Sequence, residues 1–254
     1  MRFSGAGLCL MLVCAWPAQG ASVARADGWT LGVADVPSAP APGAKPRTPL
    51  RLEVLAAQAA EGSASVQAVP YERAVEQLAD GQLDAWIGVV PLDSSVSAAI
   101  HRKRLDVSVS PMAILRSDTD IHDWSALAGR TVCLSADGRY VGELAARFAA
   151  LEQVYPSATD ALLALRTGAC DAAVQDEGFL RQLLKYPEWR KFSAQLQPYR
   201  KQVLERLSRA DAAPAVRDAL RQATAAMRLQ LLAAQQARDI AFEVYLDQSV
   251  PDCH

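Results

Sequence analysis

The sequence contains no block of basic residues, no apolar run long enough to cross a membrane and no familiar metal-binding motif. It carries 26 lysine and arginine residues against 28 aspartate and glutamate residues, for a net charge of −2 at pH 7. Binding to nucleic acid through neutralised phosphates is therefore not expected. No stretch approaches the about eighteen apolar residues of a membrane span. CxxC and HExxH are absent and the three histidines are scattered, so we predict neither a metal site nor a cofactor.

Residues 1–26 have the pattern of an export signal. Arg2 supplies a positive charge, residues 8–16 form a short apolar stretch, and small residues follow it. Cleavage after Gly20 or after Ala26 fits this pattern. We therefore expect an exported protein that works in the periplasm.

Three cysteines remain after the expected cleavage, namely Cys133, Cys170 and Cys253. Exported proteins tend to pair their cysteines because the compartment is oxidising. Cys133 lies in a predicted strand and Cys170 begins another, so neighbouring parallel strands would bring the two together. We predict a Cys133–Cys170 disulfide and a free Cys253. The alternative is that Cys133 and Cys170 are two buried free thiols.

A unit of helix, glycine and apolar strand occurs twice. The first copy reads LADGQLDAWIGV and the second reads LRTGACDAAVQD; without a gap, Leu78, Gly81, Asp84 and Ala85 align with Leu165, Gly168, Asp171 and Ala172. Each glycine is expected to end its helix in the left-handed conformation. Strand and helix patterns alternate on both sides of these copies, which favours parallel sheets covered by helices. We therefore predict two similar α/β lobes with one copy in each.

Several stretches, taken in order, resemble the extracellular solute-binding proteins of the polar-amino-acid type, which are the periplasmic receptors of ABC importers. The resemblance covers roughly residues 29–236 and rests on YERAVEQLADGQLDA, RLDVSVSP, DWSALAGRTVCLS and ALLALRTGACDAAVQD. It implies a periplasmic binding protein-like II fold, with two Rossmann-like lobes, two hinge crossings and a ligand cleft between the lobes. It also implies a monomer with two partners, a small-molecule ligand and a membrane permease.

The extended stretches SVSPMAIL and SAQLQPYR bracket the βα pattern of the second lobe. We expect the crossings near residues 110–115 and 196–204. Lobe 1 then comprises residues 27–112 and 205–254, with the C-terminal helices packed on it. Lobe 2 comprises residues 113–204.

Asp176 closes the second copy of the repeat, where the end of a parallel strand faces the cleft. In the amino-acid receptors that the chain resembles, a carboxylate at the matching place holds the ligand's ammonium group through short charge-assisted bonds. The alternative is that Asp176 caps the helix that follows it. Val89 holds the equivalent place in the first copy.

A ligand carboxylate would need an arginine fork. The resemblance places that arginine just before RLDVSVSP, where we prefer Arg102 to Arg104 because the alignment needs a shift of one residue. Arg73, near the start of a predicted helix, is a second candidate. Otherwise these arginines are solvated surface charges.

The segment SADGRYVGEL opens a helix of the second lobe, where the family binds an anion on exposed backbone N–H groups. This assigns Gly138, Arg139 and Tyr140 to the ligand site; the alternative for Tyr140 is a half-buried packing role. Asp137 stands where the family has glycine. Its carboxylate is expected to cap the helix and to repel a ligand carboxylate, which argues against an ordinary α-amino acid.

The function expected from these features is capture of a small polar solute that carries an amine, for delivery to an ABC importer. Two alternatives are an exported enzyme on the same scaffold, resembling cyclohexadienyl dehydratases, and a free-standing sensing module. One confident cleft carboxylate, where acid–base chemistry would use a pair, favours a binding protein over an enzyme.

Overall fold

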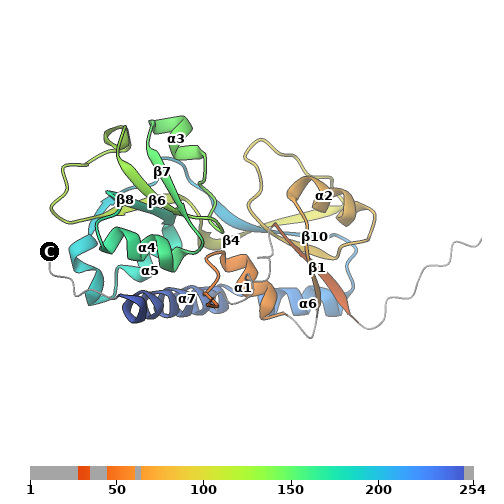
Figure 1. The fold of residues 1–254 in the computed structure, drawn as a ribbon. Helices are drawn as coiled ribbons and strands as arrows, with labels where there is room; N and C mark the ends of the chain where they lie inside the picture. Colours follow the sequence, from red (N-terminus) through yellow and green to blue (C-terminus); the bar gives the residue numbers. More distant parts are fainter. Residues whose placement is uncertain (1–27, 35–44, 61–63, 249–254) are drawn as a thin grey trace, which may run out of the picture.

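Two five-stranded sheets, each covered by helices, form the two lobes of the protein (Figure 1). The structure is a computed structural model that describes residues 28–34, 45–60 and 64–248. The predicted export signal and Cys253 lie outside the described residues. Within them, no helix is long and apolar enough to cross a membrane.

Lobe 1 is built on a mixed sheet with the strand order β2-β1-β3-β10-β4. Strand β1 pairs in parallel with β2 and β3, whereas β10 is antiparallel to β3 and β4. The elements of this lobe are β1 (Trp29–Val33), α1 (Leu52–Gln58), β2 (Ala64–Ala68), α2 (Tyr71–Ala79), β3 (Ala85–Gly88), β4 (Ile100–Ser108), β10 (Val203–Arg209) and α6 (Pro214–Ala223).

Lobe 2 repeats this plan with the strand order β7-β6-β8-β5-β9. Here β6 is parallel to β7 and β8, and β5 is antiparallel to β8 and β9. Its elements are β5 (Pro111–Leu115), η1 (Trp124–Leu127), β6 (Thr131–Ser135), α3 (Glu143–Phe148), β7 (Leu151–Tyr155), α4 (Ala158–Arg166), β8 (Ala172–Asp176), α5 (Glu177–Leu183), η2 (Pro187–Phe192) and β9 (Ala194–Leu196). The two sheets confirm the predicted fold class.

The chain passes between the lobes at residues 109–110, from β4 to β5, and at residues 197–202, from β9 to β10. The expected first crossing at residues 110–115 therefore falls mostly within β5. Each crossing is short and contains neither helix nor strand.

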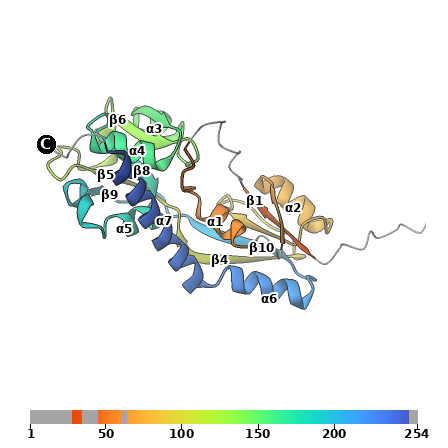
Figure 2. The ribbon, with the colours of Figure 1, turned by 60° about the horizontal axis from the view of Figure 1, so that its bottom comes forward.

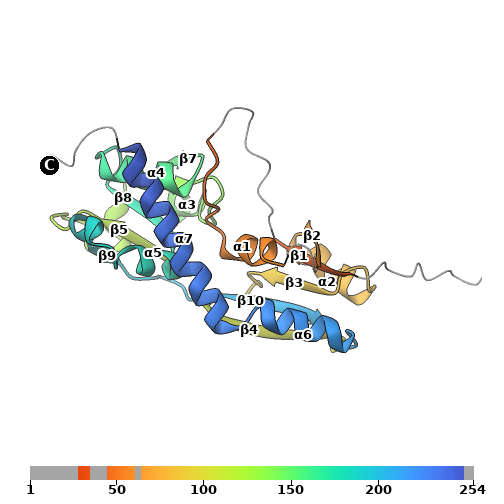
Figure 3. The same cartoon turned by 90° about the horizontal axis from the view of Figure 1, so that it is seen from below.

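The last helix, α7 (Ala226–Asp247), corrects the expected placement of the whole C-terminal segment on lobe 1. Leu229 and Ala233 of α7 pack in the core of lobe 1, but Ala237, Ile240 and Val244 pack in the core of lobe 2. Figures 2 and 3 show α7 leaving α6 and running along lobe 2 beside α4 and α5. Helix α7 therefore joins the two lobes.

The repeated unit has the predicted local structure in both lobes. Gly81 and Gly168 end α2 and α4 with φ angles of 70° and 78°, in the left-handed region that glycine adopts without strain. Leu78 and Leu165, one turn earlier, are both buried.

The predicted disulfide between Cys133 and Cys170 is present, with their Cα atoms 5.8 Å apart. Strands β6 and β8 are parallel neighbours, and Cys133 lies opposite Ala173 in their register. Cys170 lies just before β8 and shares the core of lobe 2 with Cys133.

Candidate functional site

Asp176, at the end of β8, is held by two neighbours from its own lobe. Its Oδ2 lies 3.1 Å from Nε of Arg139, and its Oδ1 lies 2.6 Å from the hydroxyl of Tyr140. The Asp176 side chain is 8% exposed. Although Asp176 occupies the N-cap position of α5, its side chain makes no capping hydrogen bond. The carboxylate therefore serves the ion pair and not the helix.

Arg139 connects Asp176 to a second carboxylate, which comes from the other lobe. Its Nη2 lies 2.6 Å and 2.5 Å from the two carboxylate oxygens of Glu53, in the first turn of α1. Glu53 is fully buried. Burial alone would lower the pKa of the Arg139 guanidinium, but the charges of Glu53 and Asp176 outweigh it and the pKa is raised. The guanidinium is therefore a permanent cation between two buried anions.

Tyr140 fixes the other side of Asp176. Its hydroxyl lies within hydrogen-bond distance of Asp176 Oδ1 and, at 2.8 Å, of the carbonyl oxygen of Val109 in the first crossing. Burial, reinforced by the charge of Asp176, raises the pKa of Tyr140 well above its ordinary value. The phenol stays protonated and acts as a donor. Its position links the site to the hinge.

The loop before Arg139 contacts the start of α1 directly. Oδ2 of Asp137 accepts a hydrogen bond from the N–H of Leu50 at 2.9 Å, and Arg51 donates to the carbonyl oxygens of Asp137 and Gly138, both at 2.9 Å. The expectation that Asp137 caps the following helix is wrong, because its carboxylate bonds across the lobes. Burial raises the pKa of Asp137 above its usual value. A Cβ at Gly138 would lie 2.9 Å from the carbonyl oxygen of Ser135, so the tight loop requires glycine there.

The structure thus brings together Asp176, Gly138, Arg139 and Tyr140 among the predicted ligand residues. It does not bring Arg102 or Arg73 to them. Arg102 forms a fork with Glu205 on the neighbouring strand β10, including a 2.8 Å bond from Nη2 to Oε1. Arg73 is exposed on α2, and Arg104 is exposed on β4. The assignment of Arg102 and Arg73 to a ligand stays a prediction.

Glu53 is the site residue that sequence reasoning missed. It is the only charged residue of α1, in the sequence LEVLAAQ. A single carboxylate in the first turn of an apolar helix, in the connection that follows a parallel strand, was the available signal. With Glu53, the site holds a pair of buried carboxylates where the sequence indicated one.

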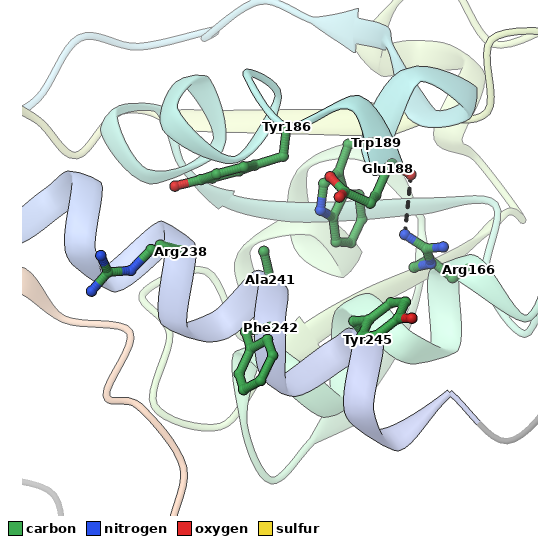
Figure 4. A pocket seen from close by; sticks show the side chains of 8 residues that line it. All are labelled: Arg166, Tyr186, Glu188, Trp189, Arg238, Ala241, Phe242 and Tyr245. Atoms are coloured by element: carbon green, nitrogen blue, oxygen red, sulfur yellow. Dashed lines mark hydrogen bonds between the residues drawn. The ribbon is translucent and has the colours of Figure 1, made fainter.

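A groove of about 300 Å³ lies elsewhere, between η2 and α7 of lobe 2 (Figure 4). Arg166 donates to the carbonyl oxygen of Glu188 at 3.1 Å and lies 5.2 Å from the ring centre of Trp189. Tyr245 and Phe242 line the groove from α7 and are exposed. The second arginine of the groove, Arg238, lies 3.4 Å from Asp239. Both arginines are therefore engaged and the rim is open, so the buried charges between the lobes form the stronger candidate site.

Within the described part of the chain, no group of three or more histidine, cysteine, aspartate or glutamate side chains is placed to hold a metal ion. The chemistry available at the site between the lobes is therefore that of two carboxylates, a guanidinium and a phenol. Two carboxylates that converge in a dry site require a cation between them.

No family model matches the chain. No curated protein matches it either. Among solved structures, a mutant of ArgBP from T. maritima is similar at 15% identity and a TM-score of 0.46, over 83% of this chain and 95% of that one. The GluR0 ligand-binding core from Nostoc punctiforme, in complex with L-glutamate, is similar at 13% identity and a TM-score of 0.48, over 82% and 98%. Substrate-binding domain 2 of Lactococcus lactis GlnP, in an open conformation, is similar at 16% identity and a TM-score of 0.40, over 85% and 96%. At these identities and TM-scores the similarity does not identify a ligand.

Proposed function

We propose that the protein is a periplasmic solute-binding protein, acting as a monomer, that captures a small amine-bearing solute between its lobes and presents it to the permease of an ABC importer. The observation that carries this proposal is the convergence of two buried carboxylates from opposite lobes, Glu53 and Asp176, on one cation. The fold supports it, because two lobes on two short crossings can open and close around a ligand.

The charges of the site select a cation. Glu53 and Asp176 need a positive group in a closed cleft, because an isolated buried carboxylate is costly, and Arg139 supplies that group in the structure. An ammonium group offers three donors, which suits two carboxylates, and charge-assisted bonds in a desolvated site are short and strong. Because the two carboxylates belong to different lobes, a cation that contacts both favours the closed arrangement.

A thermal-shift screen of the purified protein against amino acids, polyamines and small organic acids tests this function. A solute present at 100 times its Kd stabilises the folded protein by about 2.7 kcal/mol, which is readily seen in a melting curve. We expect compounds with an amine to raise the melting temperature and organic acids without one to leave it unchanged. Stabilisation by amine-free acids alone would refute the proposal.

A free-standing sensing module is the second candidate, because the lobes contact each other directly through Glu53 and Arg139, and a ligand bound at these residues would alter that contact. A sensor reports a conformational change and does not need to hand over its ligand. Uptake of a labelled solute by cells with and without the protein separates the two functions, since only an importer component changes uptake. The site holds the pair of carboxylates that acid–base chemistry would use, but Arg139 engages both of them, so we propose a binding protein and not an enzyme. Incubation with prephenate or arogenate tests this, and we expect the substrate to stay unchanged.

A further inference from the structure

We propose that Arg139 is a built-in occupant of the solute's cation site, and that a solute binds by displacing its guanidinium group. This inference rests on the proposed function and describes the regulation of the same site. The chain would carry its own competitor, which fills the site and closes the lobes when no solute is present.

The first support is the position of the guanidinium. It contacts both oxygens of Glu53 and one oxygen of Asp176, and its side chain is 10% exposed. A second cation that reached both carboxylates would have to occupy the same space. Two cations side by side in a dry site also repel each other strongly. Binding of a solute ammonium and the present placement of Arg139 therefore exclude each other.

The second support is a segment that fastens lobe 1 to lobe 2 next to Glu53. We call residues 45–51 the strap. Leu50 packs in the core of lobe 2, and its N–H donates to Asp137 of the same lobe. Arg47 of the strap forms an ion pair with Asp160 of α4 at 2.8 Å.

The strap is also bound by α7. The N–H and hydroxyl of Thr48 donate to Glu243 at 3.0 Å and 2.7 Å, and Gln236 donates to the carbonyl oxygens of Pro49 and Leu50 at 2.8 Å and 2.6 Å. The strap leads directly into α1, which carries Glu53 two residues later. The protein's own side chains thus hold Glu53 against lobe 2, and closure does not depend on a solute.

Competition of this kind lowers the apparent affinity for the solute, because only the fraction of molecules with Arg139 displaced can bind it. Shortening Arg139 removes the competitor and leaves the two carboxylates free. We expect Arg139→Ala to bind cations at this site about tenfold or more tightly than the natural protein. A solute that binds at a different place on the protein should bind Arg139→Ala and the natural protein with the same affinity.

Chemical rescue tests the inference with a defined probe, the ethylguanidinium ion, which reproduces the end of the arginine side chain. The melting temperature of Arg139→Ala is measured against increasing millimolar ethylguanidinium chloride. We expect a lower starting melting temperature than in the natural protein, followed by a saturable rise. The natural protein and the matched control Arg116→Ala, whose arginine pairs with exposed Asp118, should show no saturable rise.

Removal of the carboxylates should abolish the rescue. In Arg139→Ala combined with Glu53→Gln and Asp176→Asn, ethylguanidinium should no longer raise the melting temperature. If Arg139→Ala does not fold, Arg139→Lys keeps a positive charge and replaces it, and we expect ethylguanidinium to give this variant a saturable rise that the natural protein does not show. Rescue that is absent, or equal in the control and carboxylate-free variants, would overturn the inference.

The two proposals fail in different ways. If ethylguanidinium rescues Arg139→Ala but no amine-bearing compound binds any form of the protein, the cation site is supported and the proposed solute-binding function is refuted. If an amine-bearing solute binds the natural protein and Arg139→Ala with the same affinity, the proposed function is supported and the role of Arg139 as a competitor is refuted.

Discussion

Asp84 and Asp171 occupy equivalent places in the two lobes and make the same hydrogen bond. Oδ2 of Asp84 accepts the N–H of Thr30 in β1 at 2.8 Å, and Oδ2 of Asp171 accepts the N–H of Thr131 at the start of β6 at 2.8 Å. In both lobes the backbone N–H of the aspartate also donates to the carbonyl oxygen of the same threonine. The repeated Gly-x-x-Asp-Ala pattern is therefore a device that fixes the start of one parallel strand against its neighbour.

Removal of this carboxylate should destabilise either lobe. We expect Asp84→Ala and Asp171→Ala each to lower the free energy of unfolding by about 1–3 kcal/mol, because a backbone N–H loses a charged acceptor. The cost should be larger at Asp84, which is buried. Chemical denaturation measures both variants, and exposed Asp93 serves as a control whose alanine variant should stay within about 0.5 kcal/mol of the natural protein. Equal stabilities in all four proteins would contradict the interpretation.

The disulfide should stabilise lobe 2 mainly by restricting the unfolded chain. Cys133 and Cys170 are 37 residues apart, and a loop of this length corresponds to about 4 kcal/mol on the chain-entropy model. We expect the Cys133→Ala/Cys170→Ala variant to unfold at a lower denaturant concentration, with a free energy of unfolding lower by about 4 kcal/mol. Reductant should destabilise the natural protein and leave the variant unchanged. Labelling of Cys133 or Cys170 under non-reducing denaturation would show that the bond does not form in the exported protein.

Arg102 should behave as a structural residue. Its partner Glu205 has a side chain that is 7% exposed, so Arg102→Ala leaves a buried carboxylate without its counter-ion. Because Arg102 itself is partly exposed, we expect a loss of about 1–3 kcal/mol, less than for a fully buried pair. Replacing both residues by methionine should restore most of the stability. A variant with unchanged stability that no longer binds an amine-bearing solute would instead return Arg102 to the ligand site.

The ion pair between Glu143 and Arg200 should make stability depend on pH. Burial alone raises the pKa of Glu143, but the hydrogen bonds from Arg200, at 3.0 Å and 2.7 Å, and from Tyr199 outweigh it, and the pKa lies below its ordinary value of 4.5. A lowered carboxyl pKa stabilises the folded state above the ordinary value, and this contribution is lost as the pH falls through the lowered pKa.

Glu143→Gln isolates this contribution. At neutral pH we expect the variant to be less stable than the natural protein by about 1 kcal/mol. The difference should shrink below pH 4.5 and vanish once the natural carboxyl group is protonated. Melting curves of both proteins from neutral pH to about pH 3 supply the comparison. A difference that stays constant over this range would assign the loss to packing and not to charge.

Features that depend on nearby residues could be predicted from the sequence. The left-handed glycines follow from helices that stop at Gly81 and Gly168, and the disulfide follows from export and from two adjacent strands. Asp176, Arg139 and Tyr140 could be placed together because they lie at the ends of neighbouring strands of one sheet.

Features that depend on residues far apart in the chain could not be predicted from the sequence. The period of α7 identifies its apolar face but does not tell which core covers it, so the contacts of Ile240 and Val244 with lobe 2 were not predicted. Arg102 meets Glu205 only because β4 and β10 are neighbouring strands. The two strands are far apart in the sequence, and only the fold brings them together. Glu53 reaches Arg139 only when the two lobes close on each other.

Calorimetric titration tests the cation site most directly. The titrant is the amine-bearing compound that most stabilises the natural protein in the thermal-shift screen. The proteins are Arg139→Ala alone and Arg139→Ala combined with Glu53→Gln or with Asp176→Asn, so that the competing guanidinium is absent from all three. Both carboxylate substitutions keep the shape of the side chain and remove its charge. Loss of one partner of a desolvated charge pair costs about 2–5 kcal/mol, so we predict that each combined variant binds about thirtyfold or more weakly than Arg139→Ala alone. Equal affinities for all three proteins would contradict the account.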